Sequence, residues 1–161
     1  MENSKMMTII TGEKNPILRQ KSKEVEHFTK EVYDLIEQMK QIVIKENALG
    51  LAAVQIGIPK RIIVCRVNDE FKVFINPEIK AFSKQKDCLE EGCLSLPNIY
   101  GEVERPKTIT LLAKNEEGKK IKLKVFGLLS RIIQHEIDHL NGILFIDKAK
   151  KIRKENRGRS F

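Results

Sequence analysis

Two histidines and a glutamate stand at a spacing that can bind a metal ion and use it. The chain contains His135-Glu136-Ile137-Asp138-His139. On a helix, positions i and i+4 lie on one face, so both imidazoles can reach the same ion. The glutamate of such an HExxH motif acts as a general base on the attacking water and is not itself a ligand. The pattern therefore predicts metal-dependent hydrolysis centred on Glu136.

A third protein ligand is expected, because catalytic zinc-type sites use three protein ligands and keep one position open. Metzincin proteases place a third histidine at the position that Phe145 occupies here. Thermolysin-like enzymes use a glutamate well downstream, but here Glu155 lies in a short basic segment. The third ligand should therefore lie upstream, where His27, a carboxylate or a cysteine could supply it.

Cys93 is the strongest upstream candidate. It lies in the segment 91–97, Glu-Gly-Cys-Leu-Ser-Leu-Pro, where the glycine permits close backbone approach and the proline ends the segment. Cys65 lies in an apolar segment and is expected to be a small buried hydrophobe. Cys88 is expected to be non-functional, and His27 is expected at the surface.

Periodicity predicts the elements that position these residues. Apolar residues recur at helical spacing after Thr29, which can cap a first helix that ends near Asn47. A second helix is expected from Gly127 to Leu140, before a C-cap at Asn141-Gly142, and it carries the HExxH motif. Between the helices, segments rich in β-branched residues predict strands over residues 51–56, 61–67, 71–75, 108–112 and 119–126.

The predicted elements indicate an α+β fold. The last two predicted strands should pair across the turn at 116–118, with the alternating lysines of 120–125 facing water. We expect a single catalytic domain over 1–147, in which antiparallel-rich sheets pack around a central HExxH-bearing helix together with an N-terminal helix. Residues 148–161 are expected to form a solvated basic C-terminal tail.

Composition limits the class of protein. The 161 residues suffice for one core, and no apolar run approaches the roughly 20 residues that a membrane span needs. The segment 1–10 lacks the pattern of a secretory signal. Three cysteines indicate free thiols or a metal ligand, which suits the cytoplasm, with an organellar or viral origin left open. In the absence of a dimerisation heptad, we expect a monomer.

Three motifs resemble, in order, those of the peptide deformylase family. The first is similar to Gly-x-Gly-Leu-Ala-Ala-x-Gln and occupies residues 48–55, with Ala48 at the first glycine. The second, Glu-Gly-Cys-Leu-Ser, is complete at 91–95, and the third, Gln-His-Glu-Ile-Asp-His, is complete at 134–139. Fainter echoes at Asn15-Pro16, 75–77 and 103–106 extend the resemblance over nearly the whole chain.

The resemblance implies a reaction and a ligand set. The family removes the formyl group from the N-terminal formylmethionine of new polypeptides and releases formate. Cys93, His135 and His139 would hold one divalent ion, with Fe(II) favoured and Zn(II), Ni(II) and Co(II) also suited to these ligands. The side chain of Gln55 and the backbone N–H of Leu94 would stabilise the oxyanion.

The resemblance and the helix periodicity together suggest how a peptide would bind. Leu128 and Ile132 share a helix face with His135 and could form the pocket for the substrate methionine. The peptide backbone could pair with residues 49–50 (Leu49, Gly50) and 91–92 (Glu91, Gly92), by strand addition. Ala48 could narrow this groove, and Tyr100 stands where the family often has an arginine for the substrate. Asp138 is expected at the surface, with orientation of the imidazoles as the alternative.

Two other functions fit parts of the sequence. A zinc endopeptidase of another HExxH lineage would cleave internal peptide bonds, but Cys93 argues against it. A basic module bound to ribosomal RNA with a structural metal would need a fourth ligand, because structural zinc sites are usually closed by four. A ribosome contact through the basic tail is compatible with the deformylase interpretation.

Overall fold

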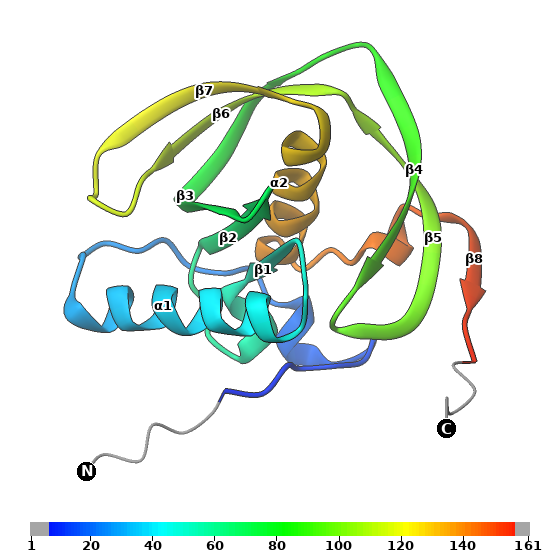
Figure 1. The fold of residues 1–161 in the computed structure, drawn as a ribbon, viewed down its shortest axis with the longest axis horizontal. Helices are drawn as coiled ribbons and strands as arrows, with labels where there is room; N and C mark the ends of the chain where they lie inside the picture. Colours follow the sequence, from blue (N-terminus) through cyan, green and yellow to red (C-terminus); the bar gives the residue numbers. More distant parts are fainter. Residues whose placement is uncertain (1–6, 157–161) are drawn as a thin grey trace.

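Two helices and two antiparallel sheets make up residues 7–156, the part of the chain that this computed structural model describes (Figure 1). The α+β architecture expected from the sequence is confirmed. The larger sheet has the strand order β1-β2-β3-β6-β7, and the smaller has the order β4-β5-β8. The helices are α1 (Lys30–Lys45) and α2 (Gly127–Leu140), and the strands are β1 (Gly50–Ala52), β2 (Ile62–Val67), β3 (Glu70–Phe82), β4 (Lys86–Cys93), β5 (Leu96–Pro106), β6 (Thr108–Lys114), β7 (Lys120–Phe126) and β8 (Lys150–Lys154).

The larger sheet is covered on both faces, by α1 on one side and by α2 on the other. Along β2, Ile62 and Val64 join the core cluster of α1, whereas Ile63 and Cys65 join that of α2. Successive side chains of a strand point to opposite faces, so the part of β2 that is buried on both faces, residues 62–65, is a continuous apolar run. Cys65 is fully buried there, as predicted.

Both predicted helices are confirmed. α1 begins after Thr29, although the Thr29 side chain makes no capping hydrogen bond. α2 ends at Leu140, and Gly142 follows with a φ of 74°, in the left-handed region where glycine is favoured. Among the described residues, no helix is long and apolar enough to span a bilayer.

The strand predicted over 51–56 was wrong in its second half. Only the first residues belong to β1, because Ala53–Ile56 form a 3-10 helix. The Gln55 side chain closes this turn by accepting a hydrogen bond from the backbone N–H of Ala52 at 2.9 Å. A side chain that folds back on its own backbone offers the chain an alternative to the sheet ladder.

The predicted pairing of β6 with β7 is confirmed, and its register runs from Thr108 opposite Phe126 to Lys114 opposite Lys120. Its lysines face solvent, but the apolar face is only partly covered, since Leu123 is 39% exposed. β4 and β5 form a second long hairpin that the sequence did not predict. The strand β4 (Lys-Asp-Cys-Leu-Glu-Glu-Gly-Cys) lacks the apolar alternation by which strands are predicted.

The first part of the predicted basic tail is strand β8, which pairs antiparallel with β5 at the edge of the smaller sheet (Figure 1). Its partners in register are Ile99 with Lys154, Tyr100 with Arg153, and Glu102 with Lys150. The basic residues of the tail beyond 156, and the first six residues of the segment 1–10, lie outside the described residues.

We expect Gly142→Ala to lower the free energy of unfolding by about 2–4 kcal/mol. Its positive φ strains any residue with a Cβ, and that Cβ would also overlap the carbonyl group of Arg19. Gly127 is a matched control, because its φ is 69° but an added Cβ would meet no described residue within 4 Å outside its own local backbone. Gly127→Ala should cost only about 1–2 kcal/mol. Urea unfolding measures both, and equal losses would contradict the steric argument.

Candidate metal centre and active site

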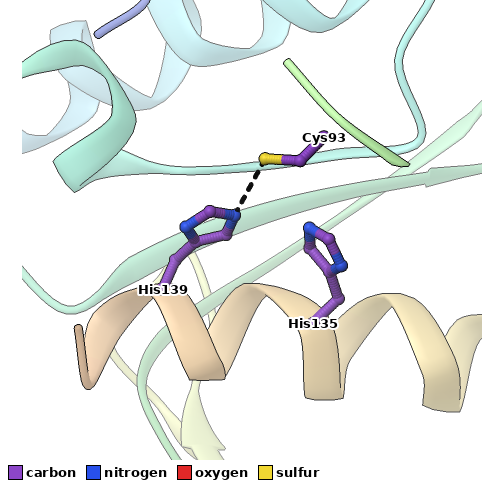
Figure 2. Close-up of side chains that lie close together, drawn as sticks. All are labelled: Cys93, His135 and His139. Atoms are coloured by element: carbon purple, nitrogen blue, oxygen red, sulfur yellow. Dashed lines mark hydrogen bonds between the residues drawn. The ribbon is translucent and has the colours of Figure 1, made fainter. Parts of the chain in front are cut away.

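The α2 helix presents two imidazoles toward the end of β4, where a thiol meets them (Figure 2). The candidate ligand atoms of Cys93, His135 and His139 all lie within 4.8 Å of one another. Cys93 Sγ lies 3.2 Å from His139 Nε2. Bond lengths of about 2.3 Å to sulfur and 2.1 Å to nitrogen place tetrahedral ligand atoms about 3.5 Å apart. The donor set and its spacing therefore fit one divalent ion.

The neighbouring charges favour the form of Cys93 that binds metals. Burial raises the pKa of the thiol, but His139 and His135 outweigh this effect and hold the pKa well below its ordinary value. A thiolate is the ligand form of cysteine. The ring of Phe145 is stacked on that of His135, with a centroid separation of 6.1 Å. The residue that excluded the metzincin pattern thus packs beside the site.

Glu91 orients one of the imidazoles. Its Oε1 lies 2.7 Å from His135 Nδ1, which leaves Nε2 of the ring facing the thiol. The carboxylate also accepts hydrogen bonds from Arg105, at 2.6 and 2.9 Å, and from Arg131, at 2.6 Å. Burial raises the pKa of Glu91, but His135 and Arg105 hold it well below its ordinary range. Sequence reasoning placed Glu91 only in the substrate groove and missed this contact.

The expectation that Asp138 lies at the surface was wrong. Asp138 is buried, and its carboxylate pairs with Arg105 at 2.9 Å and with Lys148 at 3.0 Å. It does not contact the imidazoles directly but supports Arg105, which in turn holds Glu91. The arginine is distant in the sequence, so the HExxH pattern carries no sign of this partner. His27, in contrast, is exposed as predicted.

Glu136 is buried beside the three candidate ligands. Its Oε2 has no hydrogen-bond partner among the described residues, and burial raises its pKa. The carboxylate lies close to β1, because a Cβ added at Gly50 would come within 2.8 Å of Glu136 Oε1. A side chain at position 50 would therefore displace Glu136. The arrangement leaves a carboxylate free to exchange a proton with a bound molecule.

Two further polar groups point at the thiol. Gln55 Nε2 lies 3.4 Å from Cys93 Sγ and donates to Ser95 Oγ at 3.1 Å. The backbone N–H of Ser95 lies 3.4 Å from the same sulfur. Leu94 lies in the tight turn between β4 and β5, and its backbone N–H makes no hydrogen bond to another described residue. Ser95 was not predicted as part of the site, although it belongs to the second motif.

A cavity of about 540 Å³ opens beside Cys93, His135 and Glu136. One wall is the segment 46–50 between α1 and β1, the other is formed by 90–100, and α2 forms the floor. The residues predicted to bind substrate all line it, namely Leu49, Gly50, Glu91, Gly92, Leu128 and Ile132. Ala48 and Tyr100 line it as well.

Comparison with known proteins identifies the family. The sequence profile described as polypeptide deformylase matches residues 6–155. The chain belongs to the polypeptide deformylase family. It is 45% identical over 152 residues to a peptide deformylase of Bartonella henselae, covering 91% of this chain and 86% of that protein. Enzymes of this family remove N-formyl groups from newly made polypeptides, so the chain is a hydrolase of linear amides.

Solved structures of the family have the same fold. A peptide deformylase of Synechococcus elongatus in complex with actinonin superimposes with a TM-score of 0.87 at 38% identity, over 94% of this chain and 83% of that one. A Met-Ala-Ser-bound class I type b peptide deformylase of Acinetobacter baumannii has a TM-score of 0.85 at 31% identity, over 90% of this chain and 99% of that one.

We expect Glu91→Gln to weaken metal binding about 10–100-fold. The amide is a weaker acceptor for His135 and no longer neutralises Arg105, so the ring loses its fixed orientation. Competition with a chromophoric chelator for Co(II) measures the change. Glu104→Gln is the control, because this substitution removes the same charge from an exposed carboxylate on β5. Wild-type affinity in a folded Glu91→Gln protein would refute the orienting role.

Proposed function

We propose that this enzyme releases formate from N-formylmethionyl peptides at a single divalent ion held by Cys93, His135 and His139. The observation that carries the proposal is the convergence of a thiol and two imidazoles beside an unpartnered buried carboxylate. When bound, the ion supplies Lewis acidity, which polarises a carbonyl and lowers the pKa of water. Fe(II) is favoured by the family resemblance, and Zn(II), Ni(II) and Co(II) suit the same ligands.

Glu136 moves the protons in this scheme. It takes one from the water that attacks the formyl carbon, and it returns this proton to the peptide nitrogen as the C–N bond breaks. The products are formate and a free amino group. Two features support the assignment. Glu136 has an oxygen with no partner in the described structure, and burial raises its pKa, which strengthens it as a base toward the attacking water.

Gln55 and Leu94 stabilise the negative charge that develops on the formyl oxygen. Both offer an N–H beside Cys93, one from a buried side chain and one from a turn backbone. The buried hydrogen bond from Ala52 to Gln55 Oε1 turns the amide nitrogen toward the site and fixes its orientation. Donors that are fixed before the reaction need no reorganisation when the charge appears.

The cavity accommodates the peptide. Leu128 and Ile132 on α2 provide apolar contact for the methionine side chain, and Leu128 is half exposed at the opening. The backbone pairs with residues 49–50 on one side and 91–92 on the other, as an added strand. The tripeptide bound to the Acinetobacter baumannii relative supports a groove that takes at least three residues.

We further propose a single catalytic domain that extends past the expected boundary at 147 to include β8 of the smaller sheet. The enzyme works as a monomer in the cytoplasm, where its three free cysteines stay reduced. The basic segment 148–161 then supplies a salt-dependent contact with ribosomal RNA. Because the chain belongs to the polypeptide deformylase family, we prefer deformylation as its main function over internal peptide-bond cleavage and over non-catalytic RNA binding.

We expect Glu136→Gln to lower kcat for formyl-Met-Ala-Ser about 10²–10⁴-fold at unchanged metal content. The isosteric amide keeps the shape but cannot exchange the proton. Formate release by anaerobically prepared, Fe(II)-loaded protein is the measurement. Glu46→Gln removes another carboxylate that lines the cavity and should leave kcat nearly unchanged. If the Fe(II)-loaded wild type released no formate, the proposed function would fail.

A further inference from the structure

Three residues in register on the smaller sheet form a stack at the wall of the cavity. Gly92 of β4 lies opposite Tyr100 of β5, which lies opposite Arg153 of β8. Residues opposite one another in a sheet point to the same face. The Tyr100 ring lies against the Gly92 backbone, because a Cβ added there would come within 2.9 Å of two ring atoms. The Arg153 guanidinium lies over the same ring, 4.7 Å from its centroid.

Arg153 also reaches the cavity wall directly. Its Nε and Nη2 donate to the two oxygens of Glu90 at 3.0 and 2.7 Å, a bidentate ion pair. Glu90 and Tyr100 both line the cavity. Arg153 therefore spans from β8 across β5 to β4 and fixes two side chains of the wall. Arg153 Nη1 also donates to Glu155, two residues further along the chain.

The ion pair determines the charge at the outer part of the cavity. Four carboxylates line it, and they differ in what neutralises them. Glu91 is paired with two arginines, and Glu136 lies deep beside the candidate ligands. Glu46 and Glu90 are exposed, and within residues 7–156 only Glu90 of these two has an ion-pair partner, which is Arg153. Loss of Arg153 would leave the outer wall with uncompensated negative charge.

The spacing along β4 relates this pair to a position in the substrate. Glu90 precedes Cys93 by three residues, which is about 10 Å along a strand. A peptide extended along β4 with its formyl group at the metal covers the same distance in three residues. We infer that Arg153 sets the charge preference for the third residue of the formylated peptide, by neutralising Glu90 and bracing Tyr100. This inference rests on the proposed function and on strand addition along β4.

The test compares formyl-Met-Ala-Asp amide with formyl-Met-Ala-Lys amide. Arg153→Ala should raise the KM of the aspartate peptide about tenfold relative to that of the lysine peptide, with kcat little changed. Lys154→Ala is the matched control, because it removes the same charge from the adjacent position of β8, on the opposite face of the sheet. It should leave the ratio of the two KM values as in the wild type.

A second variant separates electrostatics from a purely structural role. The double change Arg153→Ala with Glu90→Gln should return the KM ratio close to the wild-type value, because the uncompensated carboxylate is gone. Formyl-Met amide, which ends before Glu90, reports general damage to the site. The inference is overturned if Arg153→Ala raises all three KM values alike, if Lys154→Ala shifts the ratio equally, or if the double variant does not restore it.

Binding of the unformylated peptides Met-Ala-Asp amide and Met-Ala-Lys amide, measured by calorimetry, gives the same comparison without turnover. A wild type that released no formate would refute the proposed function, and the binding ratio would still test Arg153. Equal ratios of the two dissociation constants in the wild type and Arg153→Ala would overturn the inference even in an active enzyme.

Discussion

The buried carboxylate of Glu91 is the interaction on which the site depends. It accepts hydrogen bonds from two arginines and contacts a histidine, and its side chain is only 6% exposed. A buried charge is costly unless its partners satisfy it, and removal of one partner leaves the others uncompensated. Here the partners come from β5 and from two turns of α2. One carboxylate therefore joins the smaller sheet to the helix that carries the imidazoles.

The position of α2 is fixed from the other side by the larger sheet. Ile133, Ile137 and Leu140 of the helix pack in the cluster that includes Ile63 and Cys65 of β2. Apolar burial holds the helix against one sheet without specifying direction, whereas the ion pairs of Glu91 hold it in one orientation against the other. The three candidate ligands thus stand on two elements whose relative position is determined by two different kinds of interaction.

The sequence predicted what local patterns encode. Periodicity and motif spacing predicted both helices, the pairing of β6 with β7 and the position of the HExxH motif on the second helix. β4 and β8 were missed because their charged residues find partners far along the chain, such as Arg153 with Glu90. Asp138 was misplaced for the same reason, since its partner Arg105 lies on another element. The turn at Gln55 depends on a side chain bonding its own backbone, which composition does not reveal.

The attachment of β8 has a consequence for how the enzyme responds to ionic strength. All five residues of this strand are exposed, so backbone ladder bonds and surface ion pairs hold it rather than buried apolar area. Salt screens surface pairs strongly and buried ones much less. Rising ionic strength should therefore loosen the outer wall of the cavity while the buried network of Glu91 stays intact. Salt would therefore act on the part of the smaller sheet that lines the outer cavity and spare the part that supports the candidate metal ligands.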